Sequence, residues 1–268
     1  MKTVLKSITG SIALLLMLTS LAAGEGLPDV LGIQLGMPAR DAYTKLQSQL
    51  PKAKIQVDSV NLPTIDKPVM LTFTAVDGGA VGAEYDKVVV DLTLPPNKQV
   101  VWRVERTHIF PAKGILKSSL LASLREKYGK ETQLVQAQGK PVQNENEITG
   151  LWWFMDEQGH PAQPPASVVQ PLSTCPRTRA ANQIVETPLP NYGNKDLAWC
   201  LSSYTGVNIG MTTNPSVPEL YTQMEVLMVS LPIGSRAGEA TKKWKDEIAS
   251  GQHQQDVDAA KQQAKPKL

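Results

Sequence analysis

Residues 29–50 of this 268-residue chain read DVLGIQLGMPARDAYTKLQSQL. The apolar run from Val30 to Leu35 indicates a short strand. Gly36 then permits a turn, and Pro38 suits the first position of a helix, where its missing N–H costs nothing. Apolar residues follow at the spacing of one helix face: Ala39, Ala42, Tyr43, Leu46 and Leu50. The stretch therefore predicts a strand, a turn and an amphipathic helix that stops before Pro51.

A second stretch repeats this pattern 78 residues later. Gly114 aligns with Gly36, and Gly129 stands where a left-handed helix cap belongs. The aligned apolar stripe of the second helix is Leu120, Leu121, Leu124 and Tyr128. The repeat favours two tandem strand–helix–sheet modules, although any two amphipathic helices share such spacing.

Three segments between the two helices alternate between apolar and polar residues. They run from Val69 to Ala75, from Val88 to Leu94 and from Trp102 to Phe110. Short connections between alternating strands predict an antiparallel sheet with one buried face. The expected fold class is therefore α+β, an antiparallel sheet packed by helices on one face.

The last third of the chain gives further strand and helix signals. Ile148 to Met155 reads as an aromatic strand, Trp199 to Met211 as a long strand, and Tyr221 to Leu231 as another. Ser235 can cap a final helix, and after Gly251 a tail rich in Gln, Ala and Lys is expected to fray. The expected organisation is a signal peptide at 1–24, modules at 25–112 and 113–250, and a polar tail at 251–268.

The beginning of the chain has the features of a secretory signal peptide. Lys2 and Lys6 precede an apolar run, and Ala22-Ala23-Gly24 places small residues where a signal peptidase reads. The run is too short for a membrane span, and no cysteine stands near the cut to carry a lipid anchor. A periplasmic or secreted protein is therefore expected, with no membrane span in the mature chain.

The net charge and the cysteine content further limit the kinds of partner and compartment that fit this protein. The chain has 27 Lys+Arg against 25 Asp+Glu, and removal of Lys2 and Lys6 with the leader balances them. A neutral chain offers no basic field for nucleic acid, so no nucleic-acid partner is expected. Cys175 and Cys200 are the only cysteines, and in an exported chain they are predicted to form one disulfide.

The sequence contains no recognisable catalytic or metal-binding motif. His108, His160 and His253 are not at metal-ligand spacing, so no metal or organic cofactor is expected. His108 lies on the apolar side of a strand, where a structural role is favoured over a catalytic one. In Trp152-Trp153-Phe154, alternate residues face opposite sides; core packing is favoured, with a stacking platform as the alternative.

The polar sides of the three central strands are the predicted binding surface. Threonine offers short, stiff hydrogen-bonding groups, and a rigid sheet face loses little side-chain entropy on binding. A solvated face that only keeps the protein soluble is the competing interpretation. The candidate binding residues are Thr72, Thr74, Asp91, Thr93, Arg103, Glu105 and Thr107.

The segment Ile33-Gln34-Leu35-Gly36-Met37, followed by a helix, resembles the opening of a small α/β module of bacterial envelope proteins. Two families carry it: the lipoprotein subunit of the outer-membrane β-barrel assembly machinery, and the β-lactamase inhibitor protein, a tandem of two such modules. Pro38 replaces their usual Thr, and Tyr128-Gly129-Lys130-Glu131 only approximates their Leu-Gly-x-Pro. The resemblance implies a non-catalytic exported module, and in the inhibitor family the tandem sheets form a concave binding surface.

Two functional hypotheses follow. The leading one is an exported, non-enzymatic binding or envelope-associated protein, with another envelope or secreted protein as its partner. The alternative is a secreted hydrolase whose site is assembled from residues distant in sequence. A buried cleft lined by His108 with a nearby carboxylate would favour the hydrolase, and a flat or concave polar sheet face would favour binding.

Overall fold

The computed structural model describes residues 27–79, 84–111, 113–136, 142–163 and 195–262. The predicted signal peptide at residues 1–24 and the predicted disulfide partner Cys175 lie outside these ranges.

The first described element is a hairpin of two-residue strands, where the sequence predicts one strand. β1 (Asp29–Val30) pairs antiparallel with β2 (Ile33–Gln34). Leu31 and Gly32 form the turn with φ values of 55° and 74°, and the Gly32 N–H donates a 2.6 Å hydrogen bond to Asp29 Oδ1. The prediction of a continuous strand from Val30 to Leu35 is wrong because this left-handed turn divides the apolar run.

The predicted first helix is confirmed as α1 (Ala39–Gln49), which begins directly after Pro38. It buries Ala39, Ala42 and Leu46 from the predicted stripe. The Tyr43 ring packs edge-to-face on Phe73 with the ring centroids 5.3 Å apart. Four strands follow: β3 (Lys54–Val60), β4 (Val69–Gly78), β5 (Tyr85–Leu92) and β6 (Val101–Ile109).

The second half of the chain repeats this order of one helix and four strands, with a further helix, α5 (Lys195–Ser203), between β9 and β10. α2 (Lys117–Tyr128) begins at the predicted offset from α1 and ends at Gly129, which has φ of 77°. The short strand β7 (Ile115–Leu116) precedes it, and the 3-10 helix η2 (Glu145–Glu147) lies before β9. The other strands of this half are β8 (Gln133–Gln136), β9 (Ile148–Met155), β10 (Thr205–Thr213) and β11 (Leu220–Ser230).

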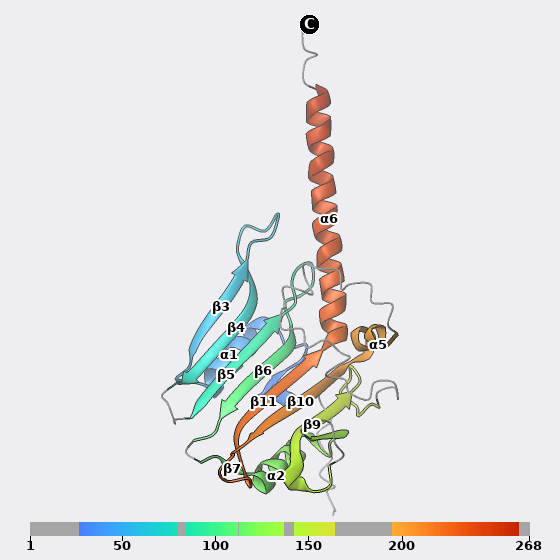
Figure 1. The fold of residues 1–268 in the computed structure, drawn as a ribbon. Coiled ribbons are helices and arrows are strands. Elements are labelled where there is room, and N and C mark those ends of the chain that lie inside the picture. Colours follow the sequence, from blue (N-terminus) through green and yellow to red (C-terminus); the bar gives the residue numbers. More distant parts are fainter. Residues whose placement is uncertain (1–26, 80–83, 112, 137–141, 164–194, 263–268) are drawn as a thin grey trace, which may run out of the picture.

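The two halves share one antiparallel sheet of nine strands (Figure 1). The strand order is β3-β4-β5-β6-β11-β10-β9-β8, with β7 also paired to β11. Each half contributes its last strand to the junction, where Val104 of β6 lies opposite Met228 of β11. From either edge of the sheet, the four strands that each half contributes to this order therefore follow in chain order, an approximate twofold arrangement. The predicted α+β class is confirmed.

Helices α1 and α2 cover the same face of this sheet. Leu46 of α1 and Leu121 of α2 belong to one buried cluster with strand residues from both halves, among them Phe73, Val104 and Met228. All five side chains are at most 1% exposed. This face forms the main hydrophobic core.

A second cluster lies on the opposite face. It joins α5 (Lys195–Ser203) and the start of α6 (Leu231–Gln262) to the sheet through Trp102, Trp152, Phe154, Cys200, Tyr204, Val229 and Leu231. The predicted long strand from Trp199 is wrong as far as Ser203, because α5 occupies this segment and β10 begins at Thr205. Alternation over so few residues does not distinguish a strand from a helix.

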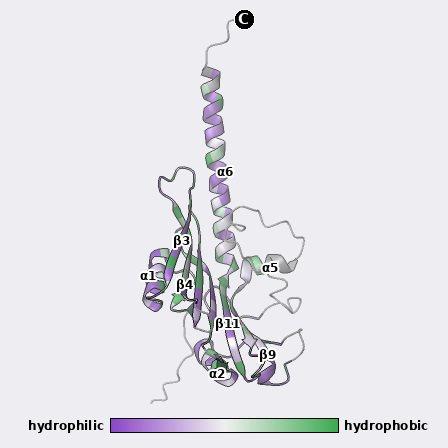
Figure 2. Ribbon diagram, turned by 60° about the vertical axis from the view of Figure 1, so that its left-hand side comes forward, coloured by the Kyte–Doolittle hydropathy of each residue, from purple (hydrophilic) through white to green (hydrophobic). Residues whose placement is uncertain are grey.

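The last helix, α6, is longer than the sequence predicts. It begins at Leu231 directly after β11, so Ser235 lies inside the helix and does not cap it. It continues through Gly251 to Gln262, and the expected fraying from residue 251 is therefore wrong as far as 262. The neighbouring Gln, Ala and Lys residues favour helix enough to tolerate one glycine. This mostly hydrophilic part of α6 projects away from the sheet (Figures 1 and 2).

Candidate functional site

The predicted binding residues of β4, β5 and β6 lie on the sheet face opposite α1 and α2. Thr72 lies opposite Asp91, and Asp91 lies opposite Arg103 on the next strand. Thr74, Glu105 and Thr107 follow at two-residue steps along these strands, so they point to the same side. We call this side of the sheet, with its continuation through Leu227, Asn208 and Trp152, the polar sheet face.

An ion-pair network occupies the centre of the first half of this face. Arg103 Nη1 donates to Asp91 Oδ2 at 2.6 Å, and Arg103 Nη2 donates to Glu105. The Thr72 hydroxyl donates to the other Asp91 oxygen at 2.9 Å. Burial raises the pKa of Asp91, although the Arg103 charge and hydrogen bonds oppose this effect. The network is satisfied internally.

Three of the seven predicted binding residues are buried, which corrects the expectation of a wholly exposed face. Asp91 is 3% exposed, Thr93 is 4% exposed and Arg103 is 6% exposed. Thr93 lies just beyond β5, where its hydroxyl donates to the Lys98 carbonyl at 2.7 Å and accepts from the Val100 N–H at 3.0 Å. It therefore holds the turn between β5 and β6, because both of its bonds cross that turn.

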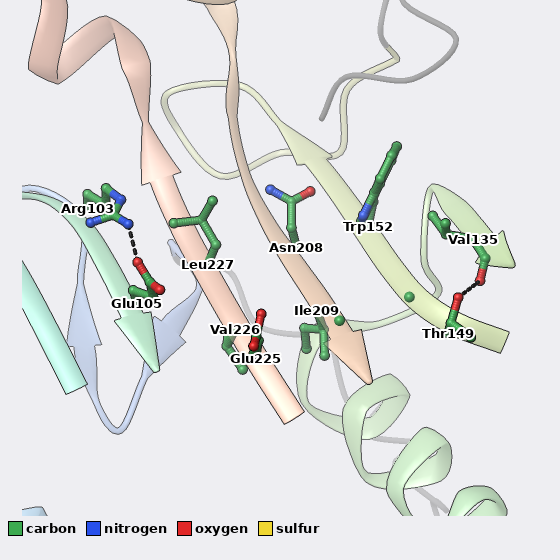
Figure 3. Close-up of a pocket in the computed structure, with 12 residues that line it drawn as sticks. Arg103, Glu105, Val135, Thr149, Trp152, Asn208, Ile209, Glu225, Val226 and Leu227 are labelled. Carbon is green, nitrogen blue, oxygen red and sulfur yellow. Dashed lines mark hydrogen bonds and ion pairs between the residues drawn. The ribbon is translucent and has the colours of Figure 1, made fainter. Parts of the chain in front are cut away.

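A pocket of about 180 Å³ opens on the polar sheet face next to this network (Figure 3). Arg103 and Glu105 of β6 contribute the wall from the first half of the chain. The second half contributes the remaining walls through Glu225 and Leu227 of β11, Asn208 and Gly210 of β10, Gly150 and Trp152 of β9, and Val135 of β8. The pocket therefore exists only because the two halves share a sheet.

Asn208 is the most unusual residue of the pocket. Its side-chain nitrogen donates a 2.6 Å hydrogen bond to the Tyr204 hydroxyl. Its Oδ1 accepts no hydrogen bond within the part of the chain that the structure describes, although the residue is only 5% exposed. An unpaired buried acceptor costs about 1–3 kcal/mol, so natural proteins rarely keep one without a reason. In Figure 3 the side chain stands on the same side of the sheet as Arg103, Leu227 and Trp152.

Two glycines line the pocket. Gly210 of β10 lies opposite Gly150 of β9 and opposite Glu225 of β11. A Cβ atom at Gly210 would meet no heavy atom of the described residues within 4 Å, and its φ is not in the left-handed region. Neither steric crowding nor backbone conformation therefore requires glycine there, although glycine weakens a strand interior. Its effect is to leave space above the sheet.

The three aromatic residues of β9 are buried, at 4%, 3% and 2% exposure for Trp152, Trp153 and Phe154. Trp153 points to the helix side, where its indole N–H donates to the Gly129 carbonyl at 3.1 Å. Trp152 lies on the polar sheet face, packs edge-to-face with Phe154 and also lines the pocket. Packing is thus the main role of the cluster, and Trp152 adds a pocket wall.

His108 has a carboxylate neighbour, but on the helix side of the sheet. Its Nδ1 lies 3.2 Å from Asp86 Oδ2, and its ring packs edge-to-face on Phe110. Asp86 also accepts 2.9 Å and 2.5 Å hydrogen bonds from Arg106. Burial opposes the ionisation of Asp86, but the bonds from His108 and Arg106 outweigh it and lower the pKa of the carboxyl. His108 does not line the pocket on the polar sheet face, so this group forms a buried ion-pair cluster.

Cys200 lies in α5 and is fully buried in the second cluster. Its predicted partner is outside the described residues, so the Cys175–Cys200 disulfide stays a prediction. Within the described ranges, no helix is both long and apolar enough to cross a bilayer. Among the same residues, no group of three or more His, Cys, Asp or Glu is placed to hold a metal ion.

Comparison of the chain with protein-family models, with curated proteins and with solved structures gave no significant match.

Sequence reasoning found the pocket wall from the first half of the chain and, from the second half, named only Trp152, as a possible stacking platform. Arg103 and Glu105 were among the predicted residues, whereas Asn208, Gly210, Glu225 and the adjoining Leu227 were not. Gly210 was a usable signal, because a glycine inside a strand leaves its position without a side chain. The pairing of β11 with β6 gave no local signal, since it joins segments more than a hundred residues apart.

Proposed function

We propose that this protein is an exported, non-enzymatic binding protein that holds its ligand on the polar sheet face. One observation carries the proposal: the pocket there keeps a buried acceptor, Asn208 Oδ1, without a partner among the described residues. A group that donates a hydrogen bond from a bound ligand would remove the cost of that burial. The rigid strands around the pocket support binding, because they lose little entropy when a ligand is held.

Export is part of the proposal and rests on the charged start, the apolar run and the Ala-x-Gly site near residue 24. The disulfide between Cys175 and Cys200 belongs with it, because such bonds persist in oxidising compartments. Peptide mapping of the protein purified from its native compartment, without reductant, should recover the linked pair. Two free thiols in that preparation would refute the pairing.

A photo-crosslinking amino acid at Glu225 tests the binding face even though the ligand is unidentified. Glu225 is exposed on β11 and lines the pocket. The matched control is the same amino acid at Arg40, which is exposed on α1 on the other side of the sheet. Irradiation in the native compartment should give a defined mass adduct from position 225 and none from position 40. No adduct from position 225, or equal adducts from both positions, would contradict the proposal.

A further inference from the structure

We propose that the pocket on the polar sheet face binds an organic cation of side-chain size, an alkylammonium or alkylguanidinium group. This inference rests on the proposed function, because it names the class of ligand for the same site.

The charge around the pocket favours a cation. Glu105 and Glu225 are the carboxylates in its described walls, and the Glu225 residue and 40% of the Glu105 side chain are exposed. Arg103, the cation among the described wall residues, is already paired with Asp91 and Glu105. Lys87 lies in the same cross-strand row as Glu225 but is separated from it by Thr107. At two strand spacings, about 10 Å, its effect is largely screened.

The hydrogen-bonding groups favour a donor. Asn208 Oδ1 is an acceptor with no partner in the described ranges, the residue is only 5% exposed, and one N–H of its amide donates to the Tyr204 hydroxyl. Glu225 uses one carboxylate oxygen to accept a 2.8 Å hydrogen bond from Gln223. Its other oxygen and Asn208 Oδ1 can both receive N–H groups from a ligand. Ammonium and guanidinium groups carry several such donors and no acceptor.

The size and walls of the pocket favour a short apolar stem. A volume of about 180 Å³ equals roughly six water molecules, which suits one side-chain-sized group rather than a drug-sized ligand. Leu227, Val135 and the Trp152 indole supply apolar surface, and the absent side chain of Gly210 leaves the space that the stem would fill. An indole is also the best aromatic neighbour for a cation.

Binding of matched small molecules to the purified protein tests the class of ligand. Titration calorimetry would compare n-butylguanidinium and n-butylammonium with n-butylurea, which has the shape of the guanidinium compound without its charge. Saturable 1:1 binding of a cation is expected, at least about tenfold tighter than butylurea, because hydrogen bonds from charged donors are the strong ones. Equal binding of butylurea, or no binding of any of the three, would overturn the proposal.

Two variants test whether the cation binds in the pocket. Glu225→Gln removes an exposed charge at constant size and should weaken cation binding by up to about fivefold. Its control is Glu239→Gln, which changes an exposed carboxylate on α6 and should leave binding unchanged. Gly210→Val should abolish binding by filling the pocket, whereas Thr212→Val, two residues along the same strand, should not. If Gly210→Val does not fold, the Glu225→Gln comparison decides, and an unchanged affinity there counts against the pocket.

The alkylammonium or alkylguanidinium group can belong to a free small molecule or to a side chain of a polypeptide. N-acetyl-arginine N-methylamide has the backbone amides of a polypeptide, so tighter binding than butylguanidinium would indicate a peptide side chain. Tighter binding of butylguanidinium would indicate a free small cation. Crosslinking at Glu225 distinguishes failure of this inference from failure of the proposed function. An adduct at position 225 without any cation binding would support the binding face and reject a cationic ligand. The absence of both the adduct and cation binding would reject both proposals.

Discussion

The hydroxyl of Tyr128, the last residue of α2, donates a 2.8 Å hydrogen bond to the backbone carbonyl of Asp29 in β1. The two residues are 99 positions apart and belong to different halves of the chain. Lys127 adds a 3.0 Å ion pair to the Asp29 carboxylate. Together with the pairing of β6 and β11, these contacts pack the two halves of the chain against each other.

We expect Tyr128→Phe to lower the free energy of unfolding by about 1 kcal/mol, because the ring remains and one hydrogen bond is lost. Tyr43→Phe is the matched control, since its hydroxyl accepts a long, 3.4 Å hydrogen bond from the exposed Gln47 side chain. Urea denaturation followed by tryptophan fluorescence and by circular dichroism measures both. One coincident transition is expected for a sheet shared by both halves, and two separated transitions would show that the halves unfold independently.

The buried network on the polar sheet face predicts a large effect of Arg103→Met. The change leaves the Asp91 carboxylate buried without its cation, which costs about 3–5 kcal/mol in comparable cases. The double variant Asp91→Leu with Arg103→Met should be more stable than Arg103→Met alone, because no unpaired charge remains. Arg236→Met is the control, since its pair with Glu157 has 62% and 32% exposed side chains and should contribute at most about 1 kcal/mol. Equal losses for Arg103→Met and Arg236→Met in urea melts would disprove the burial argument.

Asp86 gives a prediction for the dependence of stability on pH. The pKa of its carboxyl is lowered in the folded state, so the ionised form contributes stability above the unfolded value of 3.8. That contribution should decline as the pH falls below the unfolded value and through the lowered pKa. Asp86→Asn does not titrate, and its stability difference from the parent chain should therefore shrink below about pH 4. A difference that stays constant down to about pH 2.5 would contradict the lowered pKa.

Two glycines of β10 should respond in opposite ways to alanine. At Gly206 an added Cβ would meet the backbone carbonyl oxygen of Trp153, which cannot move without breaking the sheet. Gly206→Ala should therefore destabilise the protein by about 1–3 kcal/mol. Gly210→Ala meets no described atom within 4 Å and should be neutral or slightly stabilising. Thermal melts of the two variants check this, and similar losses for both would remove the argument that Gly210 is present to leave space.

The spacing of apolar residues along the chain predicted the class of the fold, because helices and strands are formed by residues that are close in sequence. The stripe at Ala39, Ala42 and Leu46 placed α1 and required an apolar surface to cover it. The same reasoning failed at Trp199–Ser203, where alternation over a few residues fits a strand and a helix equally well. It also failed after Gly251. The exposed part of α6 extends a helix whose first turns are packed against the sheet, and the residues after Gly251 do not by themselves show that the helix continues.

The sequence by itself determined the α+β class, the two helices at matching offsets and the polar side of β4, β5 and β6, because each follows from spacing along the chain. The tertiary structure alone decided that β6 pairs with β11, since the free energy of that junction comes from packing between distant segments. This pairing brings Arg103 and Glu105 beside Asn208 and Gly210 and so creates the pocket. It also determines which polar groups are buried: Asp91 and Arg103 satisfy each other, whereas Asn208 keeps an acceptor that no other described residue satisfies.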